Sequence, residues 1–238
     1  PRNMIPEFCR AVRELRPRAF IMENVRGLTR ATFAPYFAYV LRQLSHPDAP
    51  PTPREAWDEH DARLQGLGAT SASYRIHAAV LNAADYGVPQ QRHRVFVVGF
   101  RADNAPEFAF PEPTHSRAAL WHAQWVSGEY WSRHGLTRPA VPAPAPPGTG
   151  NPARLPWLTL RDAIGDLPAP SERASAFNHR LVPGARAYPG HTGSPVDQPS
   201  KALKAGVHGV PGGENTVLFP SGELRYLTVR EAARVQTF

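Results

Sequence analysis

One stretch anchors the sequence: Tyr86-Gly87-Val88-Pro89-Gln90-Gln91-Arg92-His93-Arg94, followed at once by Val95-Phe96-Val97-Val98-Gly99-Phe100. Gly and Pro interrupt regular structure, and the apolar run after them has the length of a buried strand. Arg92 and Arg94 are two positions apart, so on an extended backbone their side chains share a face. Two guanidinium groups at a strand entrance suit a planar or phosphorylated ligand. A solvated strand entrance accounts for the same pattern equally well.

The composition favours an anionic partner and a reducing compartment. The net charge is +7, and of 27 cationic residues only Lys201 and Lys204 are lysines. Arginine suits bidentate contacts to phosphate and guanine, although a GC-rich genome also favours it. The single cysteine excludes an internal disulfide, and no apolar run reaches the ~20 residues of a membrane span. With no signal peptide and no metal-ligand spacing among the histidines, we expect a cytoplasmic protein without a structural metal.

A second polar site follows another predicted strand. Residues 4–16 have apolar side chains at helical spacing, and Ala19-Phe20-Ile21-Met22 is a short apolar run that we expect to be a buried strand. It ends in Glu23-Asn24-Val25. Helix, strand and polar turn are typical of a doubly wound α/β fold, in which ligands gather at the carboxyl ends of strands. Glu23 is therefore a candidate proton donor, unless Glu23 or Asn24 only caps the next loop.

The other elements of the first half follow from their spacing. Residues 33–44 and 54–66 are predicted to be helices, and residues 74–81 a strand. Cys9 falls within the apolar stripe of the first helix, whereas a nucleophilic cysteine needs an open, electropositive setting. We therefore interpret Cys9 as a packing residue.

The second half is less regular. Residues 103–156 hold many prolines and isolated aromatic residues, and the low-complexity run 139–147 indicates a flexible loop or insertion. A short helix is expected over 157–164. The glycine-rich run 206–213 either lets the backbone approach a partner closely or makes tight turns. Its spacing does not fit a phosphate-binding loop.

The end of the chain carries a clear helix signal. Thr228 and Glu231 form a capping box, with Thr as cap and Glu three residues later. Arg230 and Arg234 lie one turn apart, as on an ordinary solvated face. The predicted buried side consists of Val229, Ala232, Ala233 and Val235.

Three blocks of the sequence resemble DNA (cytosine-5)-methyltransferases, in the order that this family uses. The first is Glu23-Asn24-Val25, and the second is Gln90-x-Arg92-x-Arg94 after Tyr-Gly-Val-Pro. The third runs from Leu227 to Phe238 and resembles the block that follows the family's variable target-recognition region. The resemblance implies a partial Rossmann-like (doubly wound) methyltransferase domain followed by an irregular target-recognition domain made mostly of strands and loops.

The resemblance also implies roles for individual residues. Glu23 matches the carboxyl group that acts at ring atoms N3 and N4 of the target cytosine, and Arg94 matches the arginine that grips the flipped base near O2. Gln90, Arg92, Asn24, Arg230 and Arg234 are expected to position DNA or the local fold. The implied partner is double-stranded DNA, and the implied methyl donor is S-adenosyl-L-methionine.

Other family blocks have no counterpart in this sequence. Neither the Pro-Cys block with the nucleophile nor the glycine-rich cofactor loop is found, and Cys9 follows no proline. We therefore expect a segment of a longer protein, inactive by itself and completed by an N-terminal catalytic part or a complementary chain, with the cofactor-binding residues unassigned. The expected divisions are 1–115, the C-terminal half of the catalytic domain; 116–222, the recognition domain with a Pro-rich insertion; and 223–238, a helix block that packs on the recognition domain.

Three hypotheses about function remain open. The first is part of a cytosine-5 methyltransferase from a bacterial restriction–modification system. The second is a split or degenerate subunit that only binds DNA or complements a partner. The third is an RNA-directed relative, against which the length of the recognition region argues.

Overall fold

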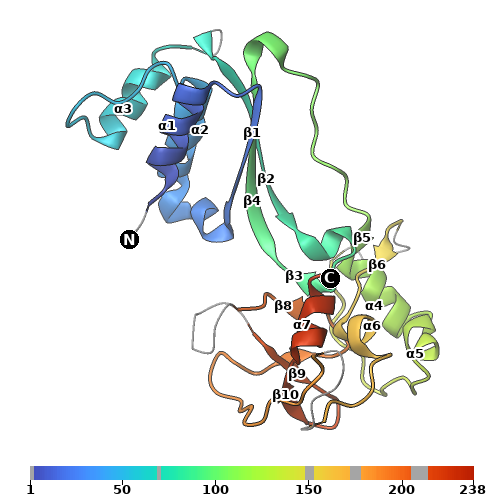
Figure 1. The fold of residues 1–238 in the computed structure, drawn as a ribbon. Coiled ribbons are helices and arrows are strands. Elements are labelled where there is room, and N and C mark those ends of the chain that lie inside the picture. The colour runs from blue at the N-terminus through green and yellow to red at the C-terminus, as the bar shows by residue number, and fades with distance from the viewer. Residues whose placement is uncertain (1–2, 69–70, 148–152, 172–177, 205–213) are drawn as a thin grey trace. The chain divides into compact units, whose positions relative to one another are not determined.

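The computed structural model describes residues 3–68, 71–147, 153–171, 178–204 and 214–238 (Figure 1). The glycine-rich run 206–213 therefore lies outside the described residues. The chain divides into two compact units: unit 1 comprises Pro1–Leu81 and His93–Pro111, and unit 2 comprises Asn82–Arg92 and Glu112–Phe238. Each unit has its own buried core. The functional division at residues 115 and 222 stays a prediction, because compactness does not say what a unit does.

Unit 1 is a mixed α/β unit in which helices cover one face of a three-stranded sheet (Figure 1). Its elements are α1 (Ile5–Leu15), β1 (Ala19–Val25), η1 (Arg26–Thr29), η2 (Ala31–Phe33), α2 (Ala34–Ser45), α3 (Trp57–Gln65), β2 (Tyr74–Asn82, ending in unit 2), β4 (His93–Arg101) and η5 (Ala102–Asn104). The helices and strands predicted for this part of the chain are thus confirmed to within a few residues.

The sheet has the order β1-β4-β2. β4 runs antiparallel to β1, with Glu23 opposite Phe96 and Val25 opposite Arg94. The flanking backbone bonds from Ala83 to Arg92 and from Ala102 to Ser73 follow the reversed order of an antiparallel pair, so β4 is antiparallel to β2 as well. The polar residues at the end of β1 consequently meet those at the start of β4.

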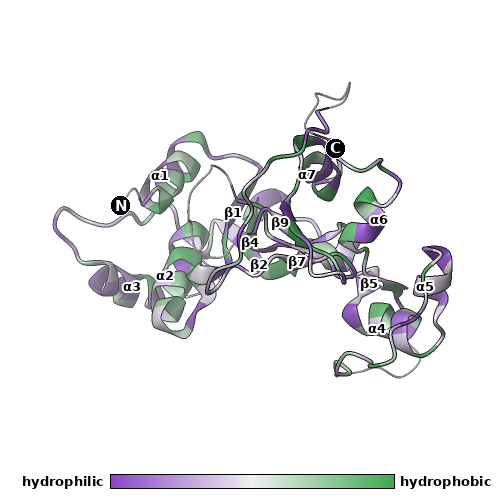
Figure 2. Ribbon diagram, turned by 90° about the horizontal axis from the view of Figure 1, so that it is seen from below, coloured by the Kyte–Doolittle hydropathy of each residue, from purple (hydrophilic) through white to green (hydrophobic). Residues whose placement is uncertain are grey.

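The core of unit 1 lies between the helices and one face of the sheet. Figure 2 shows α1 and α2 with both hydrophobic and hydrophilic residues, as expected for helices with one buried side. The buried side chains are Ile5, Cys9, Val12, Phe20, Met22, Tyr39, Val40, Leu44, Leu64, Tyr74, Val95 and Val97.

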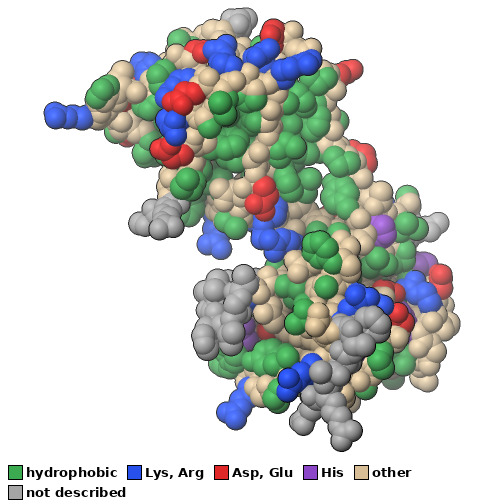
Figure 3. Space-filling view, viewed as in Figure 1, with side chains coloured by type: hydrophobic (Ala, Val, Ile, Leu, Met, Phe, Trp, Pro, Cys, Tyr) green, Lys and Arg blue, Asp and Glu red, His purple; other side chains and the backbone are tan. Residues whose placement is uncertain are grey.

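β1 was expected to be buried throughout, but burial alternates from residue to residue along this strand. Phe20 and Met22 are buried, whereas Ile21 is 67% exposed. The physical reason is that α1 and α2 cover only the face that carries Phe20 and Met22. On the opposite face, the rings of Phe100 and His77 pack with Phe108. Figure 3 shows hydrophobic side chains at the surface of unit 1.

Unit 2 consists of short elements joined by loops. They are η4 (Ala83–Tyr86), β3 (Gln90–Gln91), β5 (His115–Ser116), α4 (Arg117–Trp125), α5 (Glu129–Arg133), β6 (Leu155–Pro156), α6 (Leu160–Ile164), β7 (Ser194–Pro195), β8 (Ser200–Lys201), β9 (Thr216–Leu218), β10 (Leu224–Tyr226) and α7 (Val229–Val235). The irregular character predicted for this part is confirmed, but the helices α4 and α5 were not expected in a region predicted to be mostly strands and loops.

Isolated aromatic residues of the segment 103–156 contribute to a buried core of unit 2. Ser116 caps α4 by accepting a hydrogen bond from the backbone of Ala119. Tyr130 is fully buried and Trp131 is 5% exposed, packed with Leu120, Ala123 and Trp157. The low-complexity run 139–147 has no helix or strand, in line with the predicted loop.

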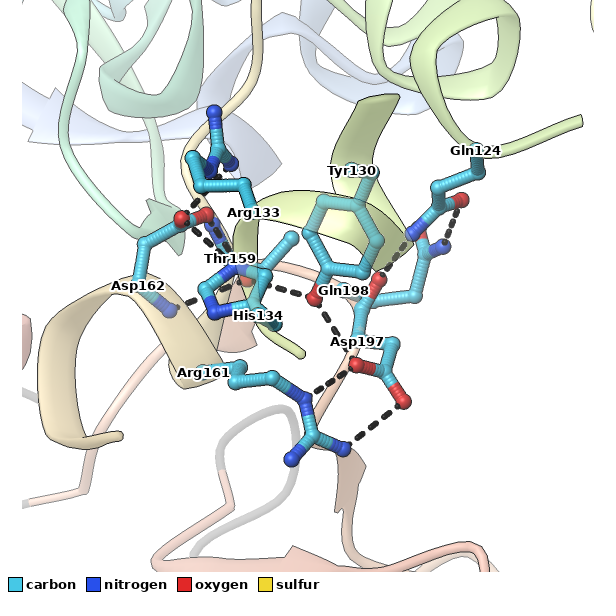
Figure 4. Close-up of polar contacts among 9 residues, drawn as sticks. All are labelled: Gln124, Tyr130, Arg133, His134, Thr159, Arg161, Asp162, Asp197 and Gln198. Carbon is cyan, nitrogen blue, oxygen red and sulfur yellow. Dashed lines mark hydrogen bonds and ion pairs between the residues drawn. The ribbon is translucent and has the colours of Figure 1, made fainter. Parts of the chain in front are cut away.

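A polar network fastens α4 and α5 to α6 and the β7 region (Figure 4). The Tyr130 hydroxyl donates to Asp197 at 2.8 Å and lies 3.0 Å from the Thr159 hydroxyl. Burial raises the pKa of Tyr130, so its hydroxyl stays protonated as a donor. Arg161 adds an ion pair to Asp197 at 2.6 Å. Because the partners are far apart in sequence, the network couples segments that would otherwise be joined only by loops.

Candidate active site and nucleic-acid interface

Glu23 and Arg94 come together because of the register between β1 and β4. Glu23 lies on the sheet face that carries Ile21, and Val25 pairs with Arg94, so Arg94 is the diagonal cross-strand neighbour of Glu23. Long side chains reach each other across such a diagonal. The Arg94 Nε atom lies 2.6 Å from Glu23 Oε1 in an ion pair.

Arg94 is the more buried partner of this ion pair, and Glu23 is the more exposed one. The Arg94 side chain is 20% exposed and donates a second hydrogen bond to the His93 carbonyl oxygen at 2.9 Å, whereas the Glu23 side chain is 49% exposed. Ion pairs with this much exposure contribute only about 0–1 kcal/mol to stability. A ligand can therefore compete for the carboxylate at little cost in folding free energy.

The end of β1 also borders an open depression of about 490 Å³. Glu23 and Asn24 line it together with the first turn of α1 and the strand residues Ile21 and Met22. The Asn24 side-chain oxygen accepts a hydrogen bond from the backbone of Val25 at 2.8 Å. Asn24 thus shapes the loop after the strand, which is the local role considered for it from the sequence.

Gln90 and Arg92 belong to unit 2. Gln90 lies in β3, which pairs in parallel with β8 opposite Ser200, and it is 1% exposed. Within the described part of the chain, its Nε2 atom has no hydrogen-bond partner, which is unusual for a buried amide. The Arg92 backbone is fixed by bonds to the Asn82 side chain and to Ala83, each 3.1 Å long.

The turn before Gln90 depends on residues that sequence reasoning did not single out. The Trp157 indole donates to Asp85 at 2.8 Å, and Asp85 also accepts from the backbone of Thr114 at 2.9 Å. Gly87 has a φ of 84°, and a Cβ atom there would meet the His115 ring at 2.9 Å. The glycine of Tyr-Gly-Val-Pro was a visible signal, but its partners come from a segment with no recognisable motif.

Arg230 and Arg234 lie on α7, whose predicted capping box is confirmed. The Thr228 hydroxyl accepts from the backbone of Glu231 at 3.2 Å, and the Glu231 carboxylate accepts from the backbone of Thr228 at 2.8 Å. Arg234 forms an ion pair with Asp166. The prediction that Val229 is buried was wrong, since it is 68% exposed.

Neither the cysteine nor any metal ligand adds to the site. Cys9 is 5% exposed, and burial raises the pKa of its thiol to about 12, so the thiolate is not available near neutral pH. Among the residues that the structure describes, no group of His, Cys, Asp and Glu is arranged to hold a metal ion. In the same residues, no helix is long and apolar enough to cross a membrane.

Comparison with known proteins decides the family. The sequence profile of the C-5 cytosine-specific DNA methylases matches residues 1–48 and 59–238. The chain belongs to this family. The resemblance inferred from the three blocks is thereby confirmed.

Individual members of the methylase family cover the chain to different extents. The Type II methyltransferase M.AquIA of Picosynechococcus sp. is 39% identical over 116 residues, which are 48% of this chain and 39% of that protein. M.BspRI of Lysinibacillus sphaericus is 26% identical over 241 residues, which are 97% of this chain and 43% of that protein. The chain thus spans less than half the length of these two relatives.

A solved structure also aligns with most of the chain. The S. pombe Dnmt2 methyltransferase superposes with a TM-score of 0.40 and 15% sequence identity over 93% of this chain and 55% of that one.

Proposed function

We propose that this chain is the part of a Type II DNA cytosine-5 methyltransferase that holds the target cytosine and reads the surrounding DNA. The observation that carries the proposal is the Glu23–Arg94 ion pair, with 2.6 Å between Nε and Oε1. It presents a carboxyl group and a guanidinium group together at one end of the sheet, where a single planar ring can engage both.

The chemistry of cytosine explains why these two groups are needed. Carbon 5 becomes nucleophilic only after a thiolate adds to carbon 6, and that addition places negative charge on ring atom N3. When the base binds, the Glu23 carboxylate takes up a proton from solvent and donates it at N3, while its other oxygen accepts from the N4 amino group. Arg94 holds Glu23 in place and attracts the O2 edge of the ring. Because neither side chain reaches a stacked base, the cytosine is flipped out at a cost of a few kcal/mol.

The methyl donor of the whole protein is S-adenosylmethionine in this proposal, but the described residues do not fit its binding site. At the end of β1, the carboxylate of Glu23 is paired with Arg94, and the Asn24 oxygen is engaged by the backbone of Val25. The other Glu23 oxygen is assigned to the cytosine in this proposal, and the sequence contains no glycine-rich cofactor loop. We therefore derive no step through the cofactor.

The open side of β1 is where we propose that a further segment docks. β1 lies at the edge of its sheet, and on the uncovered face Ile21 and Val25 are 67% and 56% exposed. An edge strand with exposed apolar side chains is suited to pairing with another strand. That segment would supply the nucleophilic cysteine, from the same polypeptide or, in the split alternative, from a partner chain.

For unit 2 we propose the reading of DNA. Gln90, whose buried amide nitrogen has no partner among the described residues, would fix the local fold, while Arg92 and Arg230 would contribute positive charge and Arg234, paired with Asp166, would hold α7 in place. Such groups position a protein on the DNA backbone, while base contacts in the grooves set the sequence. A protein with this role acts on DNA in the bacterial cytoplasm, as part of a restriction–modification system.

The test is single-turnover methyl transfer to duplex DNA by the whole protein carrying Glu23→Gln. We expect the rate to fall about 10²–10⁴-fold, the usual effect of losing a proton donor, with little change in DNA affinity. Glu107→Gln is the matched control, because Glu107 is an exposed glutamate in the same unit. Unchanged turnover in Glu23→Gln would remove Glu23 from the mechanism.

A further inference from the structure

Among the residues that the structure describes, two guanidinium groups next to the Glu23–Arg94 pair have no partner. Arg26 directly follows β1 and begins η1, and Arg30 directly follows η1. Both are exposed. Within the described part of the chain, neither side chain forms an ion pair or a hydrogen bond.

Most other arginines of unit 1 are engaged by carboxylates. They are Arg10, Arg13, Arg16, Arg42, Arg63 and Arg101, together with Arg94 itself. Arg18, Arg54 and Arg75 are exposed and also lack an ion pair among the described residues, but they lie elsewhere: Arg18 precedes β1, Arg54 precedes α3, and Arg75 lies near the start of β2. The unpaired charge of unit 1 beside the proposed active site therefore comes from Arg26 and Arg30.

The backbone holds these two arginines close to Arg94. Val25 pairs with Arg94 across the sheet, so Arg26 is one residue from that pairing. The turn between them is closed by bonds from the Arg30 backbone to Gly27 at 3.2 Å and from the Thr29 hydroxyl to Arg26 at 2.9 Å. At the 3₁₀ rise of about 2.0 Å per residue, the two positions are about 8 Å apart.

The charge balance at this end of the sheet is positive. Arg26, Arg30 and Arg94 bring three guanidinium groups, and the carboxylate of Glu23 is already used by Arg94. Exposed, unpaired guanidinium groups at a fixed spacing favour a ligand that carries several phosphate groups. A single DNA strand carries one phosphate per about 3.4 Å along the helix axis, so a spacing of about 8 Å matches two positions on one backbone.

We infer that Arg26 and Arg30 bind phosphate groups of the DNA strand that carries the target cytosine, beside the flipped base. The inference rests on the proposed function and deepens it. Contacts to the backbone on the flank of the target hold the strand in place while the base rotates toward Glu23 and Arg94. Arg26 and Arg30 are positioning residues, since they touch the backbone rather than the reacting ring.

The test is the salt dependence of duplex-DNA binding by the whole protein, compared with Arg26→Gln, Arg30→Gln and the double variant. Each lost phosphate contact reduces the slope of log affinity against log salt by about 0.9, so the double variant should lose nearly two units. Arg26→Lys should keep the slope, because an ammonium group also neutralises a phosphate. Arg75→Gln, which removes the same charge near the other end of the sheet, should leave the slope unchanged.

The possible outcomes separate the inference from the proposed function. Wild-type binding that does not weaken with salt would overturn the proposed role in DNA binding. A steep wild-type slope that persists in the double variant, or falls equally in Arg75→Gln, would overturn the inference alone. Inorganic phosphate, tested as a ligand by thermal shift, should stabilise the protein far less than duplex DNA at equal phosphate concentration. If phosphate and DNA raise the melting temperature equally, and the effect of phosphate is lost in the double variant, the site binds a free anion instead.

Discussion

Gly87 shows how one residue shapes the proposed DNA-reading turn. Its φ of 84° is in the left-handed region, and the ring of His115 occupies the space that a side chain would need. A residue other than glycine in this conformation costs about 1–3 kcal/mol. The turn therefore requires glycine for both backbone and packing reasons.

Gly87→Ala is expected to destabilise the protein by more than Gly128→Ala. Gly128 has a similar φ of 74°, but a Cβ atom there would meet nothing within 4 Å. The control thus carries the backbone strain without the clash against His115. Urea denaturation of the whole protein measures both changes in the free energy of unfolding. If the two variants lose the same free energy of unfolding, the contact with His115 does not affect stability.

The meeting of Glu23 and Arg94 was predictable from their motifs, but its geometry was not. The resemblance placed both residues on one base, and the structure has them in an ion pair. The diagonal contact depends on the register between β1 and β4, which no local pattern in the sequence encodes. For the same reason the Asp85–Trp157 bond, which joins residues 72 positions apart, was not predictable.

At the scale of the element, α7 combines a predictable cap with an unpredicted ion pair. The Thr-x-x-Glu pattern correctly predicted that Thr228 and Glu231 cap the helix. Glu231 is also buried at 1% exposure, because Arg225 from β10 binds its two oxygens at 2.7 Å each. The buried side of α7 is thus formed by Glu231 and Val235, and not by Val229.

Glu231→Ala is expected to lower the free energy of unfolding by about 3–5 kcal/mol, since it leaves the largely buried guanidinium of Arg225 without its carboxylate partner. Glu223→Ala removes an exposed glutamate nearby in the same chain segment and should change stability by less than about 0.5 kcal/mol. Chemical denaturation compares the two. A similar small loss in both variants would mean that the Arg225–Glu231 pair does not hold α7 in place.

The helices α4 and α5 show where composition misled the prediction. The segment holds many prolines and scattered aromatic residues and was expected to be irregular, because neither helical nor strand spacing is sustained there. The aromatic residues are instead buried in a core with Trp157, and Tyr130 is tied to Asp197 by a hydrogen bond of 2.8 Å. Such a core assembles from short segments through long-range contacts, so it leaves no periodic signal in the sequence.

At the scale of the whole molecule, we propose that catalysis and sequence reading belong to different stretches of one chain. Exchange of residues about 120–220 for those of a family member with another target should change the methylated sequence and keep the methyl group at carbon 5. The physical reason is that base contacts specify the sequence, whereas the role proposed for Glu23 and Arg94 is confined to the flipped ring. Sequencing of methylated DNA identifies both the target and the modified atom. Retention of the original target would show that the boundary of the recognition region is wrong.

The central claim is that Glu23 and Arg94 act as one unit on a single flipped cytosine. A double-mutant cycle tests it most directly, with single-turnover methyl-transfer rates for the wild type, Glu23→Gln, Arg94→Gln and the variant with both changes. Residues that act as a unit give strongly non-additive effects, so we expect the double variant to be about as slow as the slower single variant. Rate losses that multiply, as for two independent sites, would contradict the account.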